Sequence, residues 1–342
     1  APIFAPDYQA FFGNDVALNA VVTTFTDGRL AVDDLGLRAA ALDLGGRVLL
    51  AAGGLPLEID LSGAIVDPDG DPVLLPLAGP ETRVDRVTLN VDFNAAEGDR
   101  WNGIFEVSGL NREGFAAETL SLEGTGRISG GEPASVLADL SFDATQLDLG
   151  NENAEAALGE RVTGSVNVAW SGGEPVRLSD LNIEGETYSL AGDATVATSE
   201  DGLDITGEAG VRADDLAVFS GLAGRTLGGA VALDSRFDIQ PLAGFFDVSL
   251  KGTTSDLVVS QPEADGILAG DVRLDVTAAR DRAGIRGTLT ALESPNASVT
   301  GQADIKTDAS TFSVSASLAD AALVLPEVTG PVRLMASADQ DG

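Results

Sequence analysis

Alternation of apolar and polar residues recurs along the whole chain and constrains its fold more than any other feature of the sequence. At 87–93, for example, every second side chain is apolar and those between are mainly polar. Because successive side chains of a strand point to opposite faces, this pattern predicts strands with one dry and one wet face. The residues predicted to share the dry face are Leu57, Ile59, Val87, Leu89, Val91, Phe93, Val231, Leu233, Phe237, Phe246, Val248, Leu250, Val272, Leu274, Val276, Phe312 and Val314.

Turn-forming pairs separate many of these segments. Asp-Gly or Asn-Gly occurs at 27–28, 69–70, 102–103, 201–202 and 265–266, and both residues of such a pair tolerate the positive φ of a tight hairpin. Neighbouring strands are therefore expected to be mainly antiparallel. Helical patterns are few and short, at 153–158 and at 214–222, where Gly224 is placed to end the helix. Both helices are expected to act as plugs or caps.

Weak internal repetition accompanies the strands. The phrase Ser-Gly-Gly-Glu-Pro occurs at 129–133 and again at 171–175, and Asp-Leu followed by an apolar residue two positions later begins at Asp34, Asp139, Asp180, Asp215 and Asp256. This predicts units of several strands each. No composition shift, linker or low-complexity tract divides the chain. We therefore expect an all-β fold with few short helices, in which residues 1–342 form one continuous, elongated body.

The amino-acid inventory excludes several classes of chemistry. The chain has 342 residues, with no cysteine and no histidine, which removes disulfides, thiolate and imidazole metal ligands, and Ser-His-Asp arrangements. Its 20 basic and 54 acidic residues give a net charge of −34, which repels the phosphate backbone of nucleic acids. We expect no enzyme activity, no cofactor, no metal site and no nucleic-acid partner.

Local motifs offer little against this expectation. Residues 67–71, Asp-Pro-Asp-Gly-Asp, resemble the start of a calcium loop, but the twelfth position is Ala78, so a hairpin turn is favoured. The glycines of 124–130 do not match a dinucleotide-binding fingerprint. A carbohydrate-active β-helix enzyme would need clustered acids and aromatic platforms, and the chain has two Trp and two Tyr. Acids placed on strands, such as Asp92 and Asp247, alternate outward.

Membrane and export signals are also missing from the sequence. No stretch approaches the roughly 20 apolar residues of a spanning helix, and residues 1–12 lack the basic start of a signal peptide. We expect a segment of a longer protein.

The dry face itself is the remaining candidate for function. It forms the core if a second sheet covers it and a long apolar groove if it is open, and periodicity does not separate these interpretations. On physical grounds alone the closed core is favoured, because exposed apolar patches larger than about a few hundred Å² are rare unless they are functional. An exported structural or adhesive β-solenoid with a closed core and no ligand is the corresponding function.

Residues 219–229, Phe-Ser-Gly-Leu-Ala-Gly-Arg-Thr-Leu-Gly-Gly, resemble a phrase of the TamB family, the large AsmA-like proteins of the Gram-negative envelope. In that family a short helix ending in such a phrase leads into a Gly-Gly strand, as at 228–233 here. The segments 252–254, 257–259 and 268–270 continue the resemblance, which is best over residues 205–342.

The resemblance implies a curved β-sheet of groove form, with hydrophobic side chains lining the inside. It implies a periplasmic protein, anchored in the inner membrane by a segment absent from this sequence. The implied function is phospholipid transport between the inner and outer membranes, together with a role in outer-membrane assembly. Implied partners are phospholipid acyl chains and a TamA-like outer-membrane barrel, the latter contacted through regions outside residues 1–342.

Overall fold

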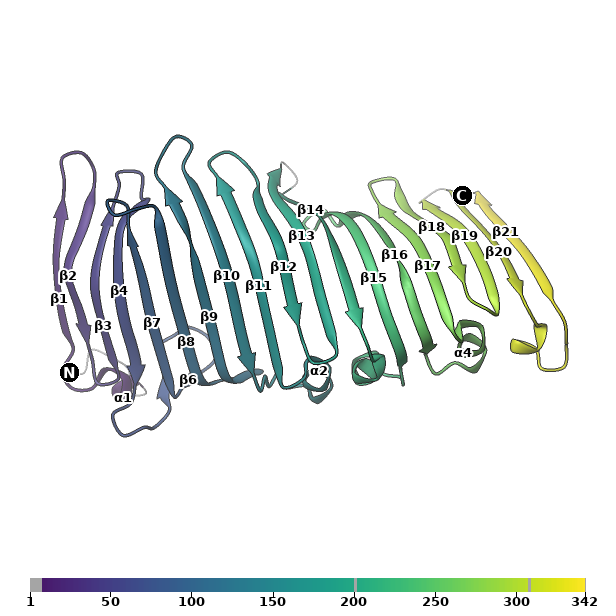
Figure 1. The fold of residues 1–342 in the computed structure, drawn as a ribbon, viewed down its shortest axis with the longest axis horizontal. Helices are drawn as coiled ribbons and strands as arrows, with labels where there is room; N and C mark the ends of the chain where they lie inside the picture. Colours follow the sequence, from purple (N-terminus) through teal and green to yellow (C-terminus); the bar gives the residue numbers. More distant parts are fainter. Residues whose placement is uncertain (1–7, 200–201, 307–308, 342) are drawn as a thin grey trace. The chain divides into compact units, whose positions relative to one another are not determined.

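Antiparallel strands make up most of the molecule. The computed structural model describes residues 8–199, 202–306 and 309–341. Strands make up 64% of the structure and helices 9%. The chain divides into two compact units, Ala1–Glu174 (unit 1) and Pro175–Gly342 (unit 2). In both units the paired strands run antiparallel and the curved sheet does not close into a barrel, which confirms the all-β fold (Figure 1). That residues 1–342 form one continuous body stays a prediction.

Unit 1 is a single layer of strands in which neighbours in sequence are mostly neighbours in the sheet. Its long strands are β1 (Ala17–Thr24), β2 (Leu30–Arg38), β3 (Leu42–Leu50), β4 (Pro56–Val66), β7 (Arg86–Asn94), β8 (Arg100–Arg112), β9 (Phe115–Ser129), β10 (Ser135–Thr145) and β11 (Arg161–Ser171). The short strands β5 (Val73–Leu74) and β6 (Thr82–Val84) form an excursion between β4 and β7, which pair directly with each other. The helices are α1 (Gln9–Phe12) and α2 (Glu152–Leu158).

Unit 2 is built in the same way. Its strands are β12 (Val176–Glu184), β13 (Tyr188–Ser199), β14 (Gly202–Ala213), β15 (Gly228–Gln240), β16 (Phe245–Val258), β17 (Asp271–Arg280), β18 (Gly284–Glu293), β19 (Ala297–Lys306), β20 (Ala309–Leu318) and β21 (Val332–Asp341). Each strand pairs with the next one in sequence. The connections contain η2 (Leu216–Phe219), α3 (Ser220–Ala223), α4 (Pro262–Leu268) and η3 (Ala321–Leu323).

In each unit the helical connections lie at one end of the strands, along one long side of the sheet, as the coiled ribbons of Figure 1 show. We call this the helical edge, and the opposite edge, where short turns such as 25–29 and 281–283 join the strands, the hairpin edge. The helix predicted at 153–158 is α2, which Asn151 caps by accepting hydrogen bonds from Asn153 N and Ala154 N. The pattern at 214–222 begins as a 3₁₀ turn, continues as α3 and ends at Gly224 in the left-handed conformation. Helices α1, α4 and η3 were not foreseen.

The turn predictions are only partly correct. The pairs at 27–28 and 69–70 form turns, with Gly28 and Gly70 at positive φ. In contrast, Asn102 and Gly103 lie within β8, paired on both sides with β7 and β9, and residues 265–266 lie in α4. At the pair 201–202, Asp201 lies outside the described residues. Strand pairing on two sides overrode the local turn preference in β8.

Three of the five Asp-Leu phrases mark irregularities of the sheet, whereas the one at Asp139 lies in a regular ladder of β10. Asp34, Asp180 and Asp256 have φ of 51°, 52° and 50°, and the register of the flanking pairs shifts beside Asp34 and Asp180. Asp tolerates this left-handed conformation better than most residues, so the phrase supplies an extra residue where the strand bends. Asp215 has another role, since its carboxylate caps η2 by accepting from Ala217 N.

A small core closes part of unit 1. Phe11 of α1, Val73 and Val84 of the β5–β6 excursion, and Val87 and Val107 of the sheet are buried together at the helical edge. Phe11 and Phe12 meet edge to face, with ring centroids 4.8 Å apart. The excursion and α1 therefore cover the ends of β7 and β8 and leave the rest of the sheet as a single layer.

Candidate functional site

The register separates the side chains of unit 2 into two chemically different faces. Residues directly opposite each other in an antiparallel pair project to the same face. Val248 lies opposite Phe237 and Ala278, whereas its neighbour Ser249 lies opposite Arg236 and Thr277. We call the face that carries Val248 the apolar face and the face that carries Ser249 the polar face.

All residues of unit 2 that the sequence assigned to the dry face lie on the apolar face. The register connects them across β15, β16, β17 and β20 through pairs such as Val276 with Leu250, and Phe312 with Ala303 of β19. These residues are Val231, Leu233, Phe237, Phe246, Val248, Leu250, Val272, Leu274, Val276, Phe312 and Val314. The alternation was therefore sufficient to place these side chains on one surface.

Unit 1 has an apolar face of its own. Ile59 lies opposite Phe93, Ile65 opposite Val87, and the residues between them continue the pairing. The predicted residues Ile59, Val87, Leu89, Val91 and Phe93 thus share one face. Leu57 is the extra residue of a bulge in β4, because Leu49 pairs with Glu58 and Leu50 with Pro56. Whether any of the predicted residues in either unit contacts a lipid stays a prediction.

Sequence reasoning missed further members of these faces. In unit 1, Trp101 and Phe105 continue the rows of Phe93 and Leu89; their alternation was present in the sequence, but the adjacent Asn-Gly pair was interpreted as a turn. In unit 2, Leu178 and Leu181 both lie on the apolar face, because the bulge at Asp180 shifts the register between them. A strict period of two does not identify residues on both sides of a bulge.

The apolar face of unit 2 is closed at one edge and open at the other. At the helical edge, Val272 is 3% exposed, and the rings of Tyr188 and Phe219 meet with centroids 5.9 Å apart. At the hairpin edge, Ile305 is 53% and Phe312 49% exposed. Most apolar side chains between these limits are half-buried. No second sheet covers this face within the described residues.

Burial along the predicted surface is not uniform. Phe93, flanked on the sheet by Ile59 and Trp101, is 1% exposed, and Val87 and Val272 are also buried. These side chains offer little area to a ligand and serve the packing of the sheet. The half-buried side chains, among them Val248 and Leu250, remain accessible.

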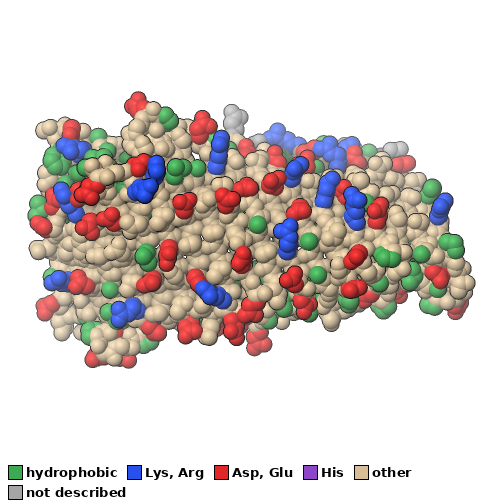
Figure 2. All heavy atoms as spheres, in the orientation of Figure 1, with side chains coloured by type: hydrophobic (Ala, Val, Ile, Leu, Met, Phe, Trp, Pro, Cys, Tyr) green, Lys and Arg blue, Asp and Glu red, His purple; other side chains and the backbone are tan. Residues whose placement is uncertain are grey.

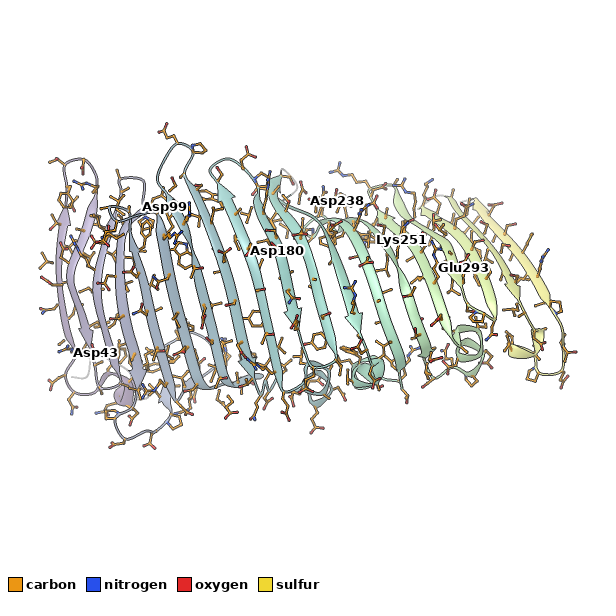
Figure 3. The ribbon with its side chains drawn as sticks, in the orientation of Figure 1. Asp43, Asp99, Asp180, Asp238, Lys251 and Glu293 are labelled. Atoms are coloured by element: carbon orange, nitrogen blue, oxygen red, sulfur yellow. The ribbon has the colours of Figure 1, made fainter. Side chains whose placement is uncertain are left out.

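The polar face carries most of the charge of the sheet strands in unit 2. Charged side chains are spread over these strands and hydrophobic ones are sparse in the view of Figure 2, and Asp238, Lys251 and Glu293 of this face are labelled in Figure 3. Lys251 pairs with Asp275 at 3.1 Å. The polar side chains thus keep one surface hydrated, in contrast to the surface behind it.

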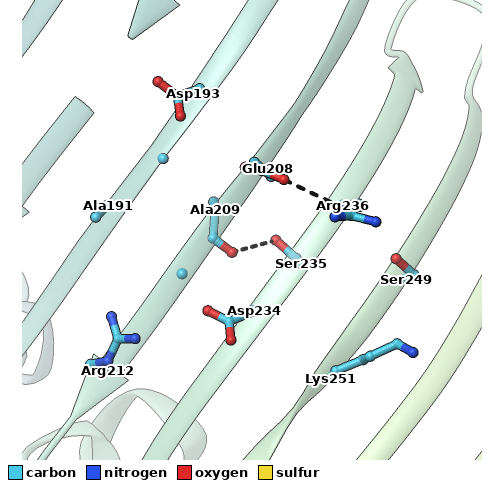
Figure 4. A pocket seen from close by; sticks show the side chains of 12 residues that line it. Ala191, Asp193, Glu208, Ala209, Arg212, Asp234, Ser235, Arg236, Ser249 and Lys251 are labelled. Carbon is cyan, nitrogen blue, oxygen red and sulfur yellow. Dashed lines mark hydrogen bonds and ion pairs between the residues drawn. The ribbon is translucent and has the colours of Figure 1, made fainter. Parts of the chain in front are cut away.

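A hollow of about 580 Å³ lies on the polar face, across β13 to β16. Its charged lining consists of Asp193, Glu208, Arg212, Asp234, Arg236 and Lys251 (Figure 4). Glu208 and Arg236 form an ion pair at 3.4 Å. Because acids and bases line it in equal number and it opens to water, this hollow is not suited to hydrocarbon.

Among the described residues, the carboxyl groups with shifted pKa values are shifted downward. The backbone N–H of Ala283 lowers the pKa of Asp281, that of Ala322 lowers the pKa of Asp320, and the Arg161 side chain lowers the pKa of Asp143. A general acid at neutral pH needs the opposite shift. These carboxylates therefore act in turns, caps and ion pairs.

The possible calcium loop is a turn. Asp67 Oδ1 accepts a hydrogen bond from Asp69 N at 2.8 Å, and the Asp67 carbonyl accepts one from Gly70 N at 3.1 Å. Within the described residues no three Asp or Glu side chains are grouped as metal ligands. The Asp67 carboxylate therefore stabilises the turn by accepting a backbone hydrogen bond.

No helix in the part of the chain that the structure describes has the length and apolar character needed to cross a membrane. Comparison with family models, with curated proteins and with solved structures gave no match for this chain. The fold and the site define a class: an open, single-layer antiparallel β-sheet protein that has, in unit 2, one accessible apolar face and one charged face.

Proposed function

We propose that the apolar face binds the acyl chains of phospholipids and conducts them between the inner and outer membranes of a Gram-negative envelope. The observation that carries the proposal is an apolar face that no second sheet covers within the described residues, with half-buried aliphatic side chains across the strands of unit 2. A role in outer-membrane assembly, a periplasmic location and a TamA-like partner belong to the same proposal and rest on the resemblance of residues 219–229.

Hydrocarbon transfer supplies the free energy for binding. Each methylene that leaves water for an apolar surface contributes about 0.8 kcal/mol. The side chains opposite Val248 and Leu250 are Phe237, Ala278 and Val276, together with Ser235, whose hydroxyl donates to the Ala209 carbonyl oxygen at 3.0 Å. They therefore do not fix a ligand at one position. A bound chain can therefore move along the face without a chemical step, and discrimination between acyl chains is weak.

Burial distinguishes this proposal from the closed-core alternative. A structural β-solenoid without a ligand requires these side chains to be sealed by a facing layer. Among the residues of unit 2 that the structure describes, the buried apolar side chains are Ala213, Val272, Ala297 and Ala321, at the helical edge. The accessibility of the remaining residues supports the conduit.

Photocrosslinking at two adjacent residues tests the proposal. A photoreactive phenylalanine analogue replaces Val248 on the apolar face or Ser249 on the polar face, and each protein is incubated with vesicles that contain a fluorescent phosphatidylethanolamine. The proposal predicts labelled protein from position 248 and little from position 249. Equal labelling at both positions, or none at either, would contradict it.

A further inference from the structure

Four basic side chains gather at the hairpin edge of unit 2. Arg280 ends β17, Arg282 lies in the following turn, Arg286 lies near the start of β18 and Lys306 ends β19. We call these four residues the basic rim. Lys and Arg side chains are concentrated along this edge in Figure 2, although the chain has only 20 basic residues against 54 acidic ones.

Arg280 belongs to the apolar face. It lies opposite Phe246 on β16 and Ile285 on β18, and Ile285 in turn lies opposite Ile305. Arg280 is thus a cation in a row that is otherwise apolar from Ile239 to Ile305. Its side chain is exposed, and no ion pair to it occurs among the described residues.

The other members of the basic rim are held in place by their neighbours. Arg286 forms an ion pair with Asp281 at 2.8 Å, and Lys306 pairs with Asp304 at 2.7 Å. The guanidinium of Arg282 lies 5.6 Å from the centroid of the Phe245 ring. Asp281 also accepts backbone hydrogen bonds from the turn at 2.7 and 3.2 Å, which fixes the backbone that carries the rim.

Arg280 differs from two other members of the basic rim in its electrostatic surroundings. Asp281 pairs with Arg286 and Asp304 with Lys306, whereas no ion pair to Arg280 occurs among the described residues. The net charge of −34 repels anions at a distance, but this repulsion is screened over about 8 Å at physiological salt. An anion already brought to the edge by its acyl chains meets Arg280, which lies on the same face as Phe246 and Ile285.

We propose that the basic rim binds the phosphate of a phospholipid whose acyl chains lie on the adjacent apolar face. This inference rests on the proposed function and adds to it the position of the lipid headgroup. The helical edge is closed by α4 and its neighbours, so a polar headgroup reaches water at the hairpin edge, beside Ile285 and Ile305. An Arg guanidinium donates two parallel hydrogen bonds to a phosphate, which Arg280 can do without breaking an existing ion pair.

Binding of two labelled lipids with identical acyl chains tests the inference. Fluorescent phosphatidylglycerol carries the phosphate and fluorescent diacylglycerol does not. The variants are Arg280→Gln, and Arg273→Gln as the control, because Arg273 is an exposed arginine on the polar face of the same strand. Arg280→Gln should weaken phosphatidylglycerol binding about tenfold and leave diacylglycerol binding unchanged. Arg273→Gln should change neither, and Arg280→Lys should restore part of the loss.

The outcomes separate this inference from the proposed function. If the wild-type chain binds neither lipid, the conduit itself is wrong. If both lipids bind and Arg280→Gln leaves phosphatidylglycerol unaffected, or weakens both lipids equally, the phosphate subsite is wrong and the conduit stands. Inorganic phosphate provides a third arm: competition at the same concentration as phosphatidylglycerol would identify a site for free phosphate and overturn the assignment to a lipid.

Discussion

Two phenylalanines on apolar faces should differ sharply in what they contribute to stability. Phe93 is 1% exposed and Phe312 is 49% exposed. Replacing a fully buried phenylalanine by alanine lowers the free energy of unfolding by about 3–5 kcal/mol, because the transfer free energy of the ring is lost and a cavity is left behind. Phe312 is about half accessible and leaves no closed cavity, so its loss should cost about 1 kcal/mol.

Urea unfolding measures this difference. Both tryptophans, Trp101 and Trp170, lie in unit 1, so their fluorescence follows the unit that contains Phe93, and far-UV circular dichroism follows both units. With an m-value of about 2 kcal/mol/M, Phe93→Ala should lower the midpoint of the fluorescence transition by roughly 2 M. Phe312→Ala should move the transition of unit 2 by roughly 0.5 M.

A large loss at Phe312 would refute the reasoning. If Phe312→Ala cost as much as Phe93→Ala, the apolar face of unit 2 would have to be covered, and a conduit would have no room for hydrocarbon. If both substitutions were nearly neutral, the packing around Phe93 would be wrong.

Other predictions concern titration and backbone geometry. Burial raises the pKa of Tyr188, so its stabilising contribution should be full below about pH 10 and be lost as the pH rises through its folded pKa; Tyr188→Phe should remove the late step of an ultraviolet titration. Arg161 lowers the pKa of Asp143, so their pair should stabilise above about pH 4 and be lost as the pH falls through the folded pKa, a dependence that acid unfolding of Asp143→Asn should lack. Gly229 has φ of 89°, and a Cβ there would collide with carbonyl oxygens of β16. Gly229→Ala should therefore lower the free energy of unfolding in urea by at least ~1–2 kcal/mol. The control Gly228→Ala should be tolerated, because Gly228 has an ordinary φ and contacts no closer than 3.5 Å.

The sequence predicts the faces of this fold better than its connections. Alternation around Val248 and Val276 follows directly from the two-residue period of a strand, and every predicted dry-face residue other than Leu57, which lies at a bulge, is on the apolar face of its unit. Turn propensity was less informative, because Asn102 and Gly103 are held in β8 by pairs on both sides. Local preference for a turn is small compared with the pairing of two neighbouring strands.

The sequence pattern did not predict whether the apolar face is covered. A side chain such as Leu250 has the same apolar neighbours in sequence whether a second sheet covers it or not, so only tertiary structure decides its accessibility. The basic rim was missed for a related reason. Arg280 and Lys306 are far apart in sequence, and the register of β17, β18 and β19 brings their strand ends to one edge.

Lipid content of the purified chain tests the account most directly. Mass spectrometry of an organic extract, made after purification without detergent from a Gram-negative host, should find diacyl phospholipid with the wild-type chain and with Thr277→Asp on the polar face. Leu250→Asp, which places a charge on the apolar face beside Val276, should lose most of that lipid while keeping the circular dichroism of the folded chain. Absence of lipid from the wild-type protein, or equal amounts in all three, would contradict the account.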